Sequence, residues 1–600
     1  MRKDRKNAIR VSKKGISRDS TLVREMFFAV SRVSMLMMLT TMIGTVVDGI
    51  VTGQYLGTDA VAATGLLSPV ILIGTLFGTI IGSGMSLLCS RALGMADPEK
   101  MNQSFSLGTW SLLAIGVLLL GIQTVLAPSI AAWVGARGES AHLAPLISDY
   151  LVGFSFGYPV LYLCIGLSGM MQMDNDRKRA LKAAAVELVV NVAGDFLNVL
   201  VFHGGLFGMA LATSISHVAG LSVLLLHFRR PNILLKLTRR VNLRELPEMA
   251  ALGLNNAISN LCVVARNMGI NFLLLSLALP AAVAALSVAN NLMNLVMSVC
   301  FGLSIGASTV ASISDGERDG GNLRQLCGIS VRAGTLLALL IGAVFIAGAP
   351  LMARLFLAGP QAALDKTAAC IRFLSASFMF RVLLYPVLGI LLGVRQKKLN
   401  YLCTVLLEGA YPLLFALAMG NLWGEAGVWW SIPAAGAAAL ITVLVIARIR
   451  KKAPLASPAD LVPLALPAEE ETDVWTASLK TMDDVAEASE GIRRFSAKMQ
   501  ADTRTQNMLS LFVEEMAGNT VQHGFGGKER DTVDLRLVKA ENGWILRIRD
   551  NGHLFDPLAW LQENHPDDPT ANVGIRIVVG TARSIQYIPM MNMNNLLIEI

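Results

Sequence analysis

Long apolar stretches occupy most of the first 450 residues, and short polar segments separate them at regular intervals. Each stretch is close to the ~20 residues that an α-helix needs to span a bilayer. Because unpaired backbone groups cost too much free energy in lipid, each stretch is predicted to be helical. We place these predicted membrane helices at 26–54, 60–90, 104–127, 145–172, 183–203, 206–228, 247–278, 282–312, 325–347, 366–393, 399–420 and 427–449.

The apolar unit occurs twice in the same order. Ala60-Val61-Ala62-Ala63 recurs 222 positions later as Ala282-Val283-Ala284-Ala285. The same shift aligns Gly84 with Gly306, Ser86 with Ser308, Ser90 with Ser312, Gly94 with Gly316, Asp97 with Asp319 and Gln103 with Gln325. A shift of 227 aligns Tyr158-Pro159-Val160-Leu161 with Tyr385-Pro386-Val387-Leu388. Two halves of the same orientation, 26–230 and 245–450, are therefore predicted, which is a plan known among transporters.

Composition and loop charge place the chain in a membrane with a defined orientation. With 54% hydrophobic and 16% charged residues, it is not a soluble protein. Basic residues gather in the N-terminal segment 1–25 and in alternate loops, whereas the opposite loops hold only Arg137, Arg354 and Lys366. The positive-inside rule then predicts a multi-pass protein of the inner (plasma) membrane with both termini cytoplasmic. The basic N-terminus is expected to be a solvated tail on anionic lipid, because no nucleic-acid recognition motif accompanies it.

Two acidic residues inside predicted membrane helices are the leading candidates for transport chemistry. Asp48 lies late in the first helix, and Asp195 lies in the fifth, four residues after Asn191. That spacing places Asn191 and Asp195 on one helix face. A carboxylate in a low-dielectric environment holds its proton more tightly and can exchange it near neutral pH. With an amide oxygen nearby it could instead bind Na⁺, so both H⁺ and Na⁺ suit these residues as coupling ions.

Other charged residues in the predicted membrane helices are expected to be mainly structural. Glu187 is close enough to one end of its helix to reach the headgroups, and several of the arginines are within reach of an interface. Glu408 lies deeper and is a second candidate for a coupling or substrate-binding acid. His203 and His217 are expected to be satisfied interior or interfacial histidines. The arginines in question are Arg32, Arg266, Arg332, Arg372 and Arg381.

The membrane part resembles the MATE (multidrug and toxic compound extrusion) transporters over about residues 20–450. The resemblance rests on D-x4-G-x3-G-x2-AVAA-x-G from Asp48 to Gly65, on Asn191-x3-Asp195, and on Gly205-x2-Gly208-x-Ala210-x-Ala212-Thr213. It implies a twelve-helix antiporter that opens alternately to either side and exports organic or cationic compounds. It further implies coupling to H⁺ or Na⁺ through Asp48 and Asp195, with Asn191 beside them.

The composition changes abruptly after Lys452. Residues 453–471 are rich in Pro, Ala and acidic residues and are predicted to be a flexible linker. From Pro454 onward, 13 Lys and Arg residues stand against 22 Asp and Glu residues, a net charge of −9, which leaves +17 for the membrane part of a chain whose total is +8. Residues 472–600 are the right size for one domain.

The pattern of this C-terminal part predicts an α+β sandwich, with helices on one face of an antiparallel sheet. Apolar residues at helical spacing, among them Leu509, Phe512, Val513 and Met516, form one face of the second helix. A loop is expected from Asp550 through Thr570. The predicted helices are Asp483–Met499, Gln506–Gly524 and one beginning at Asn572, and the predicted strands are Val533–Val538, Trp544–Arg549 and Leu596–Ile600.

Four residues of this domain have the chemistry of a nucleotide site. Glu515 and Asn519 share one helix face, where an amide oxygen can bind Mg²⁺ and a carboxylate can orient a nucleophile. Asp550 at a strand end can accept a hydrogen bond from an exocyclic amine. Gly574 at a helix start lets backbone N–H groups approach phosphates. The chain contains no G-x-x-x-x-G-K-[ST] sequence, which excludes a P-loop ATPase.

The order of these motifs resembles the Bergerat-type (GHKL) ATP-binding fold, and anti-sigma-factor serine kinases in particular. The motifs are VEEMAGNTVQHGF, RDNGHLFDP and NVGIRIV, the last beginning at Asn572, where the family usually has glycine. The resemblance implies Mg-ATP as cofactor and a short ATP lid before the third motif. It implies Glu515 as catalytic base, Asn519 as the Mg²⁺ ligand, Asp550 and Gly552 as adenine contacts and Gly574 as a phosphate contact.

Two functions of different classes follow. The chain is either an ion-coupled exporter with a regulatory or serine-kinase-like ATP-binding domain, or a membrane-tethered sensor whose transporter half no longer exports. Flipping of a lipid-linked substrate is a weaker alternative, because a flexible linker transmits force poorly. The expected partners are a small-molecule or cationic substrate and a cytoplasmic anti-anti-sigma-like protein, with a dimer through the C-terminal domain and no nucleic acid.

Overall fold

The computed structural model forms two compact units, which are described one by one. One comprises Phe27–Leu466, and the other joins Met1–Met26 to Pro467–Ile600. We call them the membrane unit and the ATPase-like unit. The structure describes residues 18–134, 138–230, 233–277, 280–356, 361–452, 456–464, 473–527, 530–540, 543–563 and 573–600.

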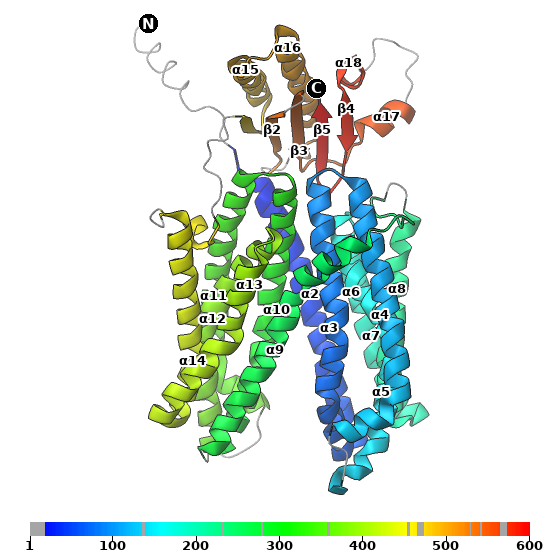
Figure 1. Cartoon of the computed structure of the whole chain (residues 1–600), viewed down its shortest axis with the longest axis vertical. Helices are drawn as coiled ribbons and strands as arrows, with labels where there is room; N and C mark the ends of the chain where they lie inside the picture. The colour runs from blue at the N-terminus through cyan, green and yellow to red at the C-terminus, as the bar shows by residue number, and fades with distance from the viewer. Residues whose placement is uncertain are drawn as a thin grey trace. The chain divides into compact units, whose positions relative to one another are not determined.

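Helices are the only regular secondary structure among the described residues of the membrane unit (Figure 1). α2 begins in the ATPase-like unit and continues into the membrane unit. The first half comprises α2 (Thr21–Val51), α3 (Thr58–Gly94), α4 (Pro98–Trp133), α5 (Ala144–Ser155), α6 (Tyr158–Met173), α7 (Arg177–Leu197) and α8 (Gly205–Leu225). The second half comprises α9 (Leu246–Ser276), α10 (Pro280–Gly316), α11 (Gly320–Phe356), α12 (Gln361–Gly393), α13 (Lys397–Val405) and α14 (Tyr411–Lys451).

Every predicted membrane helix falls on a helix of the structure. Among the described residues, ten helices are long and apolar enough to cross a membrane, or eleven if α5 and α6, which meet at 47°, form one bent span. The segment Lys397–Lys451 is 55 residues long, and ~1.5 Å of rise per residue makes it more than twice as long as a bilayer core is thick. It reverses at Gly424, where φ is 59° and ψ −137°, so the predicted helices 399–420 and 427–449 lie on either side of this break.

The helix bounds confirm the duplication. α3 and α10 are both 37 residues long, and both of their ends differ by the 222 positions found in the sequence. α4 and α11 begin at Pro98 and Gly320, again 222 apart. The second echo is imperfect, because Tyr158 begins α6 after a break whereas Tyr385 lies inside the continuous α12. In Figure 1, α3–α8 and α9–α14 form two groups of helices within this unit.

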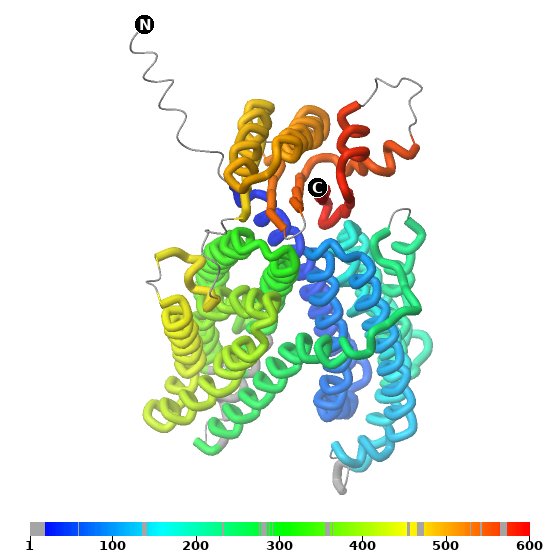
Figure 2. Tube along the Cα trace, turned by 45° about the horizontal axis from the view of Figure 1, so that its top comes forward, coloured from blue at the N-terminus to red at the C-terminus, as the bar shows by residue number. Residues whose placement is uncertain are grey.

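The C-terminal part of the ATPase-like unit is built on a five-stranded antiparallel sheet in the order β1-β2-β3-β5-β4. Figure 2 follows its chain through the helix pair α15 and α16 and on to α18. The strands are β1 (Val474–Leu479), β2 (Val533–Ala540), β3 (Gly543–Asp550), β4 (Ser584–Tyr587) and β5 (Asn594–Glu599). The helices are α15 (Met482–Lys498), α16 (Thr503–Phe512), α17 (Pro557–Glu563) and α18 (Val573–Thr581), and two π-helical segments, Val513–Ala517 and Thr520–Gly524, extend α16.

The predicted α+β sandwich is confirmed. Leu509, Phe512, Val513 and Met516 are all buried in one core between the helices and the sheet. Sequence reasoning missed β1, β4 and α17, because each is short and its apolar residues do not stand out from the neighbouring loops. Lys539 and Trp544 pair across β2 and β3, as the predicted hairpin requires.

The predicted linker is not uniformly flexible. Its residues 456–464 belong to the membrane unit, where Pro458–Leu461 forms a 3₁₀ turn with a capping box between Ser457 and Asp460. Lys451 Nζ lies 3.0 Å from Asp460 Oδ1, and Val462 is fully buried. Burial alone would raise the pKa of Asp460, but Lys451 and Ser457 outweigh it and hold that pKa well below its usual value. Residues 453–455 and 465–472 lie outside the described part.

Candidate functional sites

The structure brings Asp48, Asn191 and Asp195 together inside the membrane unit. Asp48 comes from the last turn of α2, and the other two come from α7. Asp48 is within hydrogen-bonding reach of both Asp195 and Asn191. None of the described residues donates a hydrogen bond to either carboxylate oxygen of Asp195 or to Oδ1 of Asp48. Two carboxylates can bond to each other only through a proton, so one shared proton could join this pair.

A row of polar side chains on α7 extends the site. Glu187, Asn191 and Asp195 follow one another at intervals of four residues, which places them on one face of the helix. Asn191 Nδ2 donates to Thr213 Oγ1 of α8 at 3.2 Å. One turn away, Glu187 bonds the ring of His217, also on α8. His217 is thus a satisfied interior histidine, whereas Glu187 has a side-chain partner rather than only reaching the headgroups.

Tyr150 of α5 joins the carboxylate pair from a third element. Its hydroxyl group interacts electrostatically with both Asp48 and Asp195. Its ring stacks on that of Phe154, with centroids 6.1 Å apart. Nothing in the sequence singles out Tyr150, because an aromatic residue in an apolar helix carries no local mark.

The second half of the membrane unit holds a different cluster, around Glu408. Glu408 is fully buried and receives Arg266 Nη1 at 2.9 Å, Tyr385 Oη at 3.0 Å and a further bond from Arg381. Arg266 and Arg381 are 3% and 2% exposed, so these two arginines are buried inside the unit with Glu408. One carboxylate and two guanidinium groups give this buried cluster one excess positive charge, in contrast to the two carboxylates of Asp48 and Asp195.

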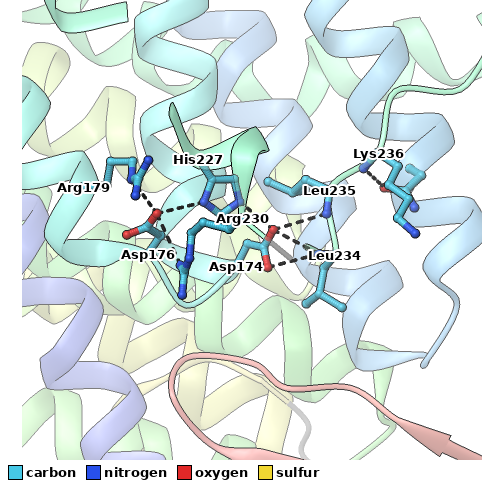
Figure 3. Close-up of polar contacts among 9 residues, drawn as sticks. Asp174, Asp176, Arg179, His227, Arg230, Leu234, Leu235 and Lys236 are labelled. Carbon is cyan, nitrogen blue, oxygen red and sulfur yellow. Dashed lines mark hydrogen bonds and ion pairs between the residues drawn. The ribbon is translucent and has the colours of Figure 1, made fainter. Parts of the chain in front are cut away.

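A third polar cluster lies around His227, at the end of the first half (Figure 3). His227 Nε2 is 2.8 Å from Asp174 Oδ2, and its Nδ1 is 3.0 Å from Asp176 Oδ2. Two carboxylate acceptors need both ring nitrogens as donors, which only the cationic imidazolium supplies. Asp174 also accepts the backbone N–H groups of Leu234 and Leu235 at 3.1–3.3 Å. The cluster therefore ties the α6–α7 turn to the connection that leads into the second half.

In the ATPase-like unit, Glu515 and Asn519 lie on the extension of α16 and are both half-buried. Glu515 lies against Gly574, the second residue of α18, where any Cβ would collide with its carboxylate. A side chain at this helix start would therefore have to displace the flexible side chain of Glu515. The structure thus brings the predicted base next to the predicted phosphate contact, although they lie in different helices and far apart in the chain.

Asp550 ends β3 and begins the loop that carries Gly552. Its Oδ1 accepts the Gly552 N–H at 2.9 Å and Asn594 Nδ2 at 2.7 Å. The two hydrogen bonds that described residues donate to Asp550 are both accepted by Oδ1. Oδ2 is therefore able to accept a hydrogen bond from an amine of a ligand. Burial raises the pKa of Asp550 to about 6, against the lowering effect of these two bonds. The loop meets the end of the Glu515 helix, where His553 N donates to Gly524 O at 2.9 Å.

Asn594 of β5 organises this loop, and sequence reasoning missed it. Besides Asp550, its Nδ2 donates to His553 O at 2.8 Å. Its Oδ1 accepts the Phe555 N–H at 3.0 Å and the Tyr587 hydroxyl at 2.7 Å. An asparagine in a C-terminal strand carries no signal of this role, because all its partners come from other segments. Asn572 and the expected ATP lid, by contrast, lie outside the described residues.

The donor set of this site fits Mg-ATP. Asp550 Oδ2 can accept from the adenine amine, and Gly574 opens a helix whose N–H groups can face phosphates. Asn519 would hold the Mg²⁺ ion through its amide oxygen, one helical turn from Glu515. Among the described residues no group of three His, Cys, Asp or Glu residues is placed to hold a metal ion without a nucleotide.

Comparison with known proteins assigns both parts. The MatE family model matches residues 34–197 and 256–407, and the model of the histidine kinase-like ATPase domain matches residues 479–596. The first model thus covers most of both halves of the membrane unit. The second includes Glu515, Asn519, Asp550, Gly552, Gly574 and Asn594.

Named relatives agree with this assignment. The multidrug export protein MepA of Staphylococcus aureus (strain NCTC 8325 / PS 47) is 24% identical over 445 residues, 71% of this chain and 94% of its own length. The probable multidrug resistance protein YoeA of Bacillus subtilis (strain 168) is 26% identical over 321 residues, 51% of this chain and 66% of its own length.

Solved structures show the same fold. An outward-facing multidrug resistance MATE family transporter of the MOP superfamily superposes with a TM-score of 0.67 at 20% identity, over 73% of this chain and 99% of that one. A MOP superfamily transporter from Pyrococcus furiosus gives a TM-score of 0.65 at 19% identity, with the same coverage. The chain belongs to the MatE family of membrane transporters and carries a histidine kinase-like ATPase domain at its C-terminal end.

Proposed function

We propose that the chain is an ion-coupled antiporter that exports organic or cationic compounds, and that its C-terminal domain binds Mg-ATP to regulate this export. The observation that carries the transport part is the pair of the partly buried Asp48 and the fully buried Asp195, with Asn191 beside it. Acids inside a membrane protein are costly and persist where they move ions or protons. The printed names of the relatives, which speak of multidrug export and multidrug resistance, support a broad range of substrates.

The proton is the better supported coupling ion. Asp48 and Asp195 lie close enough to share one proton, and two carboxylates competing for it would release it when the helices carrying them separate. Na⁺ is the alternative, with Asn191 as an added oxygen ligand. The excess of basic residues on one side of the membrane supports an orientation with both termini in the cytoplasm.

For the C-terminal domain, binding of Mg-ATP is supported by the free acceptor of Asp550 and the helix start at Gly574. Bound ATP would supply a transferable phosphoryl group. Glu515 could orient a hydroxyl of a partner protein towards it, which would make the domain a serine kinase for an anti-anti-sigma-like protein. Dimerisation through this domain belongs to the same proposal.

The test uses the full-length protein in liposomes. Export of ethidium is followed by fluorescence under an imposed pH gradient, and then under a Na⁺ gradient of equal size. The pH gradient is expected to drive export in the wild type but not in Asp48→Asn or Asp195→Asn. Asp59→Asn is the matched control, since its side chain is 65% exposed and away from the pair. Export by Asp48→Asn at the wild-type rate would refute the role of the pair.

The second candidate function is that of a sensor that binds a ligand in the transporter half and signals through the ATPase-like domain. What favours it is the presence of a complete candidate nucleotide site in the same chain. The same variant separates the two functions. Asp48→Asn would leave ATP-dependent phosphorylation of a partner intact in a sensor, while the wild type would fail to move ethidium under either gradient.

A further inference from the structure

The residues that precede the membrane helices form part of the ATPase-like unit. Met1–Met26 clusters with Pro467–Ile600 rather than with the membrane unit. Of these, residues 18–26 are described. The expectation of a solvated N-terminal tail is therefore wrong for residues 18–25, which are bound to the C-terminal domain. We call residues 18–25 the N-terminal segment.

The anchor of the N-terminal segment is Arg18. Its Nη2 lies 2.7 Å from Asp534 Oδ2 and its Nε 3.2 Å from Oδ1 of the same carboxylate. The two side chains are only 10% and 8% exposed. A paired, largely buried guanidinium–carboxylate contact is among the stronger and more directional polar interactions in proteins.

Asp19 adds a second set of bonds to the same sheet. Its backbone N–H donates to Ser478 Oγ at 2.8 Å, and its carboxylate meets Lys480 Nζ at 3.0 Å. The carboxylate also accepts from Ser20 N and Thr21 Oγ1, at the start of α2. Burial opposes ionisation, but Lys480 and Thr21 outweigh it and hold the pKa of Asp19 below its usual value.

These contacts fall on one row of the sheet. Ser478, Asp534, Arg549 and Asn595 lie directly opposite one another across β1, β2, β3 and β5. The residues next to them in β1 and β2, such as Leu479 and Leu535, belong to the apolar core. Because side chains alternate along a strand, this polar row faces away from that core. The N-terminal segment therefore lies on the second face of the sheet.

The last contact reaches the candidate nucleotide site. Asn551 Nδ2 donates to Glu25 Oε2 at 2.9 Å and to Arg530 O at 2.9 Å. Its Oδ1 accepts the Thr532 N–H at 2.9 Å. Asn551 is the residue between Asp550 and Gly552, the two expected adenine contacts. Glu25 thus helps to fix the loop in the arrangement in which Gly552 N–H bonds Asp550 Oδ1 and leaves Oδ2 for a ligand.

We propose that the N-terminal segment couples the nucleotide site to the first membrane helix. This rests on the proposed binding of Mg-ATP. The docked segment preorganises the Asp550–Gly552 loop, so nucleotide and segment stabilise each other, as thermodynamic linkage requires. Glu25 lies on α2, which continues without interruption to Val51 and carries Asp48. Nucleotide occupancy thereby regulates the helix that holds half of the ion-coupling pair.

The test compares variants of the full-length protein in nanodiscs, with Mg-AMP-PNP as the probe. Arg18→Gln and Glu25→Ala remove the contacts at either end of the segment. Arg24→Gln is the matched control, because its side chain is exposed on the first turn of α2. Two quantities are measured: the dissociation constant of AMP-PNP, and hydrogen–deuterium exchange of the amides of residues 19–26 with and without it.

In the wild type and in Arg24→Gln, AMP-PNP is expected to slow exchange of residues 19–26. Arg18→Gln and Glu25→Ala are expected to bind AMP-PNP at least about fivefold more weakly and to lose this protection. Wild-type affinity and protection in both variants would overturn the coupling, as would faster exchange on adding nucleotide to the wild type. A loss of near-UV circular dichroism in Arg18→Gln would mean that this variant is misfolded. The coupling is then judged from Glu25→Ala alone, because that variant breaks a single hydrogen bond.

The two proposals fail in different ways. If the wild type does not bind AMP-PNP, nucleotide binding itself is refuted, and the coupling falls with it. If the wild type binds and Asn519→Ala weakens binding, but the variants of the segment behave like the wild type, only the coupling is refuted.

Discussion

Gly94 and Gly316 occupy the same position in the two halves of the membrane unit, and each lies against the backbone of the other's helix. Gly94 ends α3 and meets the carbonyl of Ile313 in α10, while Gly316 ends α10 and meets the carbonyl of Arg91 in α3. Arg91 Nε also lies 3.0 Å from Asp315 Oδ2. The shift of 222 residues in the sequence is thus a symmetric contact between the halves in space.

This contact predicts that neither glycine tolerates a side chain. In Gly94→Ala or Gly316→Ala the new methyl group would overlap a carbonyl group, so α3 and α10 would have to separate at a cost of about 1–3 kcal/mol. We expect a lower melting temperature in detergent and slower ethidium export. Gly328→Ala in α11 is the control, because a methyl group added there would meet no atom within 4 Å beyond the neighbouring backbone of its own helix. Equal melting temperatures for all three variants would contradict the prediction.

The same pair shows what the sequence reveals and what it does not. The repeat is visible because it recurs at a fixed shift, and Asp48 and Asp195 because they are charged residues within apolar stretches. The Glu515–Asn519 pair is visible because the two residues lie one helical turn apart. Arg18 and Asp534 are 516 residues apart, and Arg266 and Glu408 are 142 apart. Such pairs are set by how distant elements pack, which leaves no period in the sequence.

Local patterns also fail where a residue has several partners in separate loops. Asn594 looks like any polar residue in a strand, and only the folded domain shows that it holds Asp550, His553 and Phe555 together. The strands β1 and β4 were not predicted for a related reason. They are defined by pairing with neighbouring strands and not by a clear alternation of apolar and polar residues.

The cluster around Glu408 predicts a large loss of stability when its charge is removed. Glu408→Gln would leave Arg266 and Arg381 buried without a counter-charge, which costs about 3–5 kcal/mol. We expect a marked drop in melting temperature in detergent. Glu425→Gln is the matched control, because the Lys366–Glu425 pair is about one-third exposed, and such pairs contribute about 0–1 kcal/mol. Similar melting temperatures for the two variants would show that the cluster is not a buried ion pair.

Asn594 is expected to strengthen nucleotide binding by holding the loop of Asp550 in place. Asn594→Ala removes the hydrogen bonds to Asp550 and His553 and leaves the Phe555 N–H and the Tyr587 hydroxyl without their acceptor. The loop should lose its fixed shape, and AMP-PNP should bind the full-length protein roughly tenfold or more weakly. Asn507→Ala, at an exposed position on α16, should bind as the wild type does. An unchanged affinity in Asn594→Ala, with native circular dichroism, would remove Asn594 from the site.

Asp550 predicts opposite pH trends for nucleotide affinity and for stability. Its pKa of about 6 lies above the ordinary value of 3.8, so the folded domain binds the proton more tightly than the unfolded chain does. The contribution of Asp550 to stability is therefore greatest at low pH and falls as the pH rises from about 4 to 6. An adenine amine needs the ionised carboxylate as acceptor, so the affinity for AMP-PNP should instead fall by about tenfold between pH 7.5 and pH 5.

Titrations of the full-length wild type and of Asp550→Asn separate this effect from ionisation of the nucleotide phosphates, which is common to both proteins. The wild type should lose affinity more steeply below pH 6 than Asp550→Asn, whose amide does not titrate. The melting temperature of the wild type, relative to that of the variant, should change in the opposite direction over the same range. Parallel affinity curves for the two proteins would mean that the carboxylate of Asp550 does not contact the bound nucleotide.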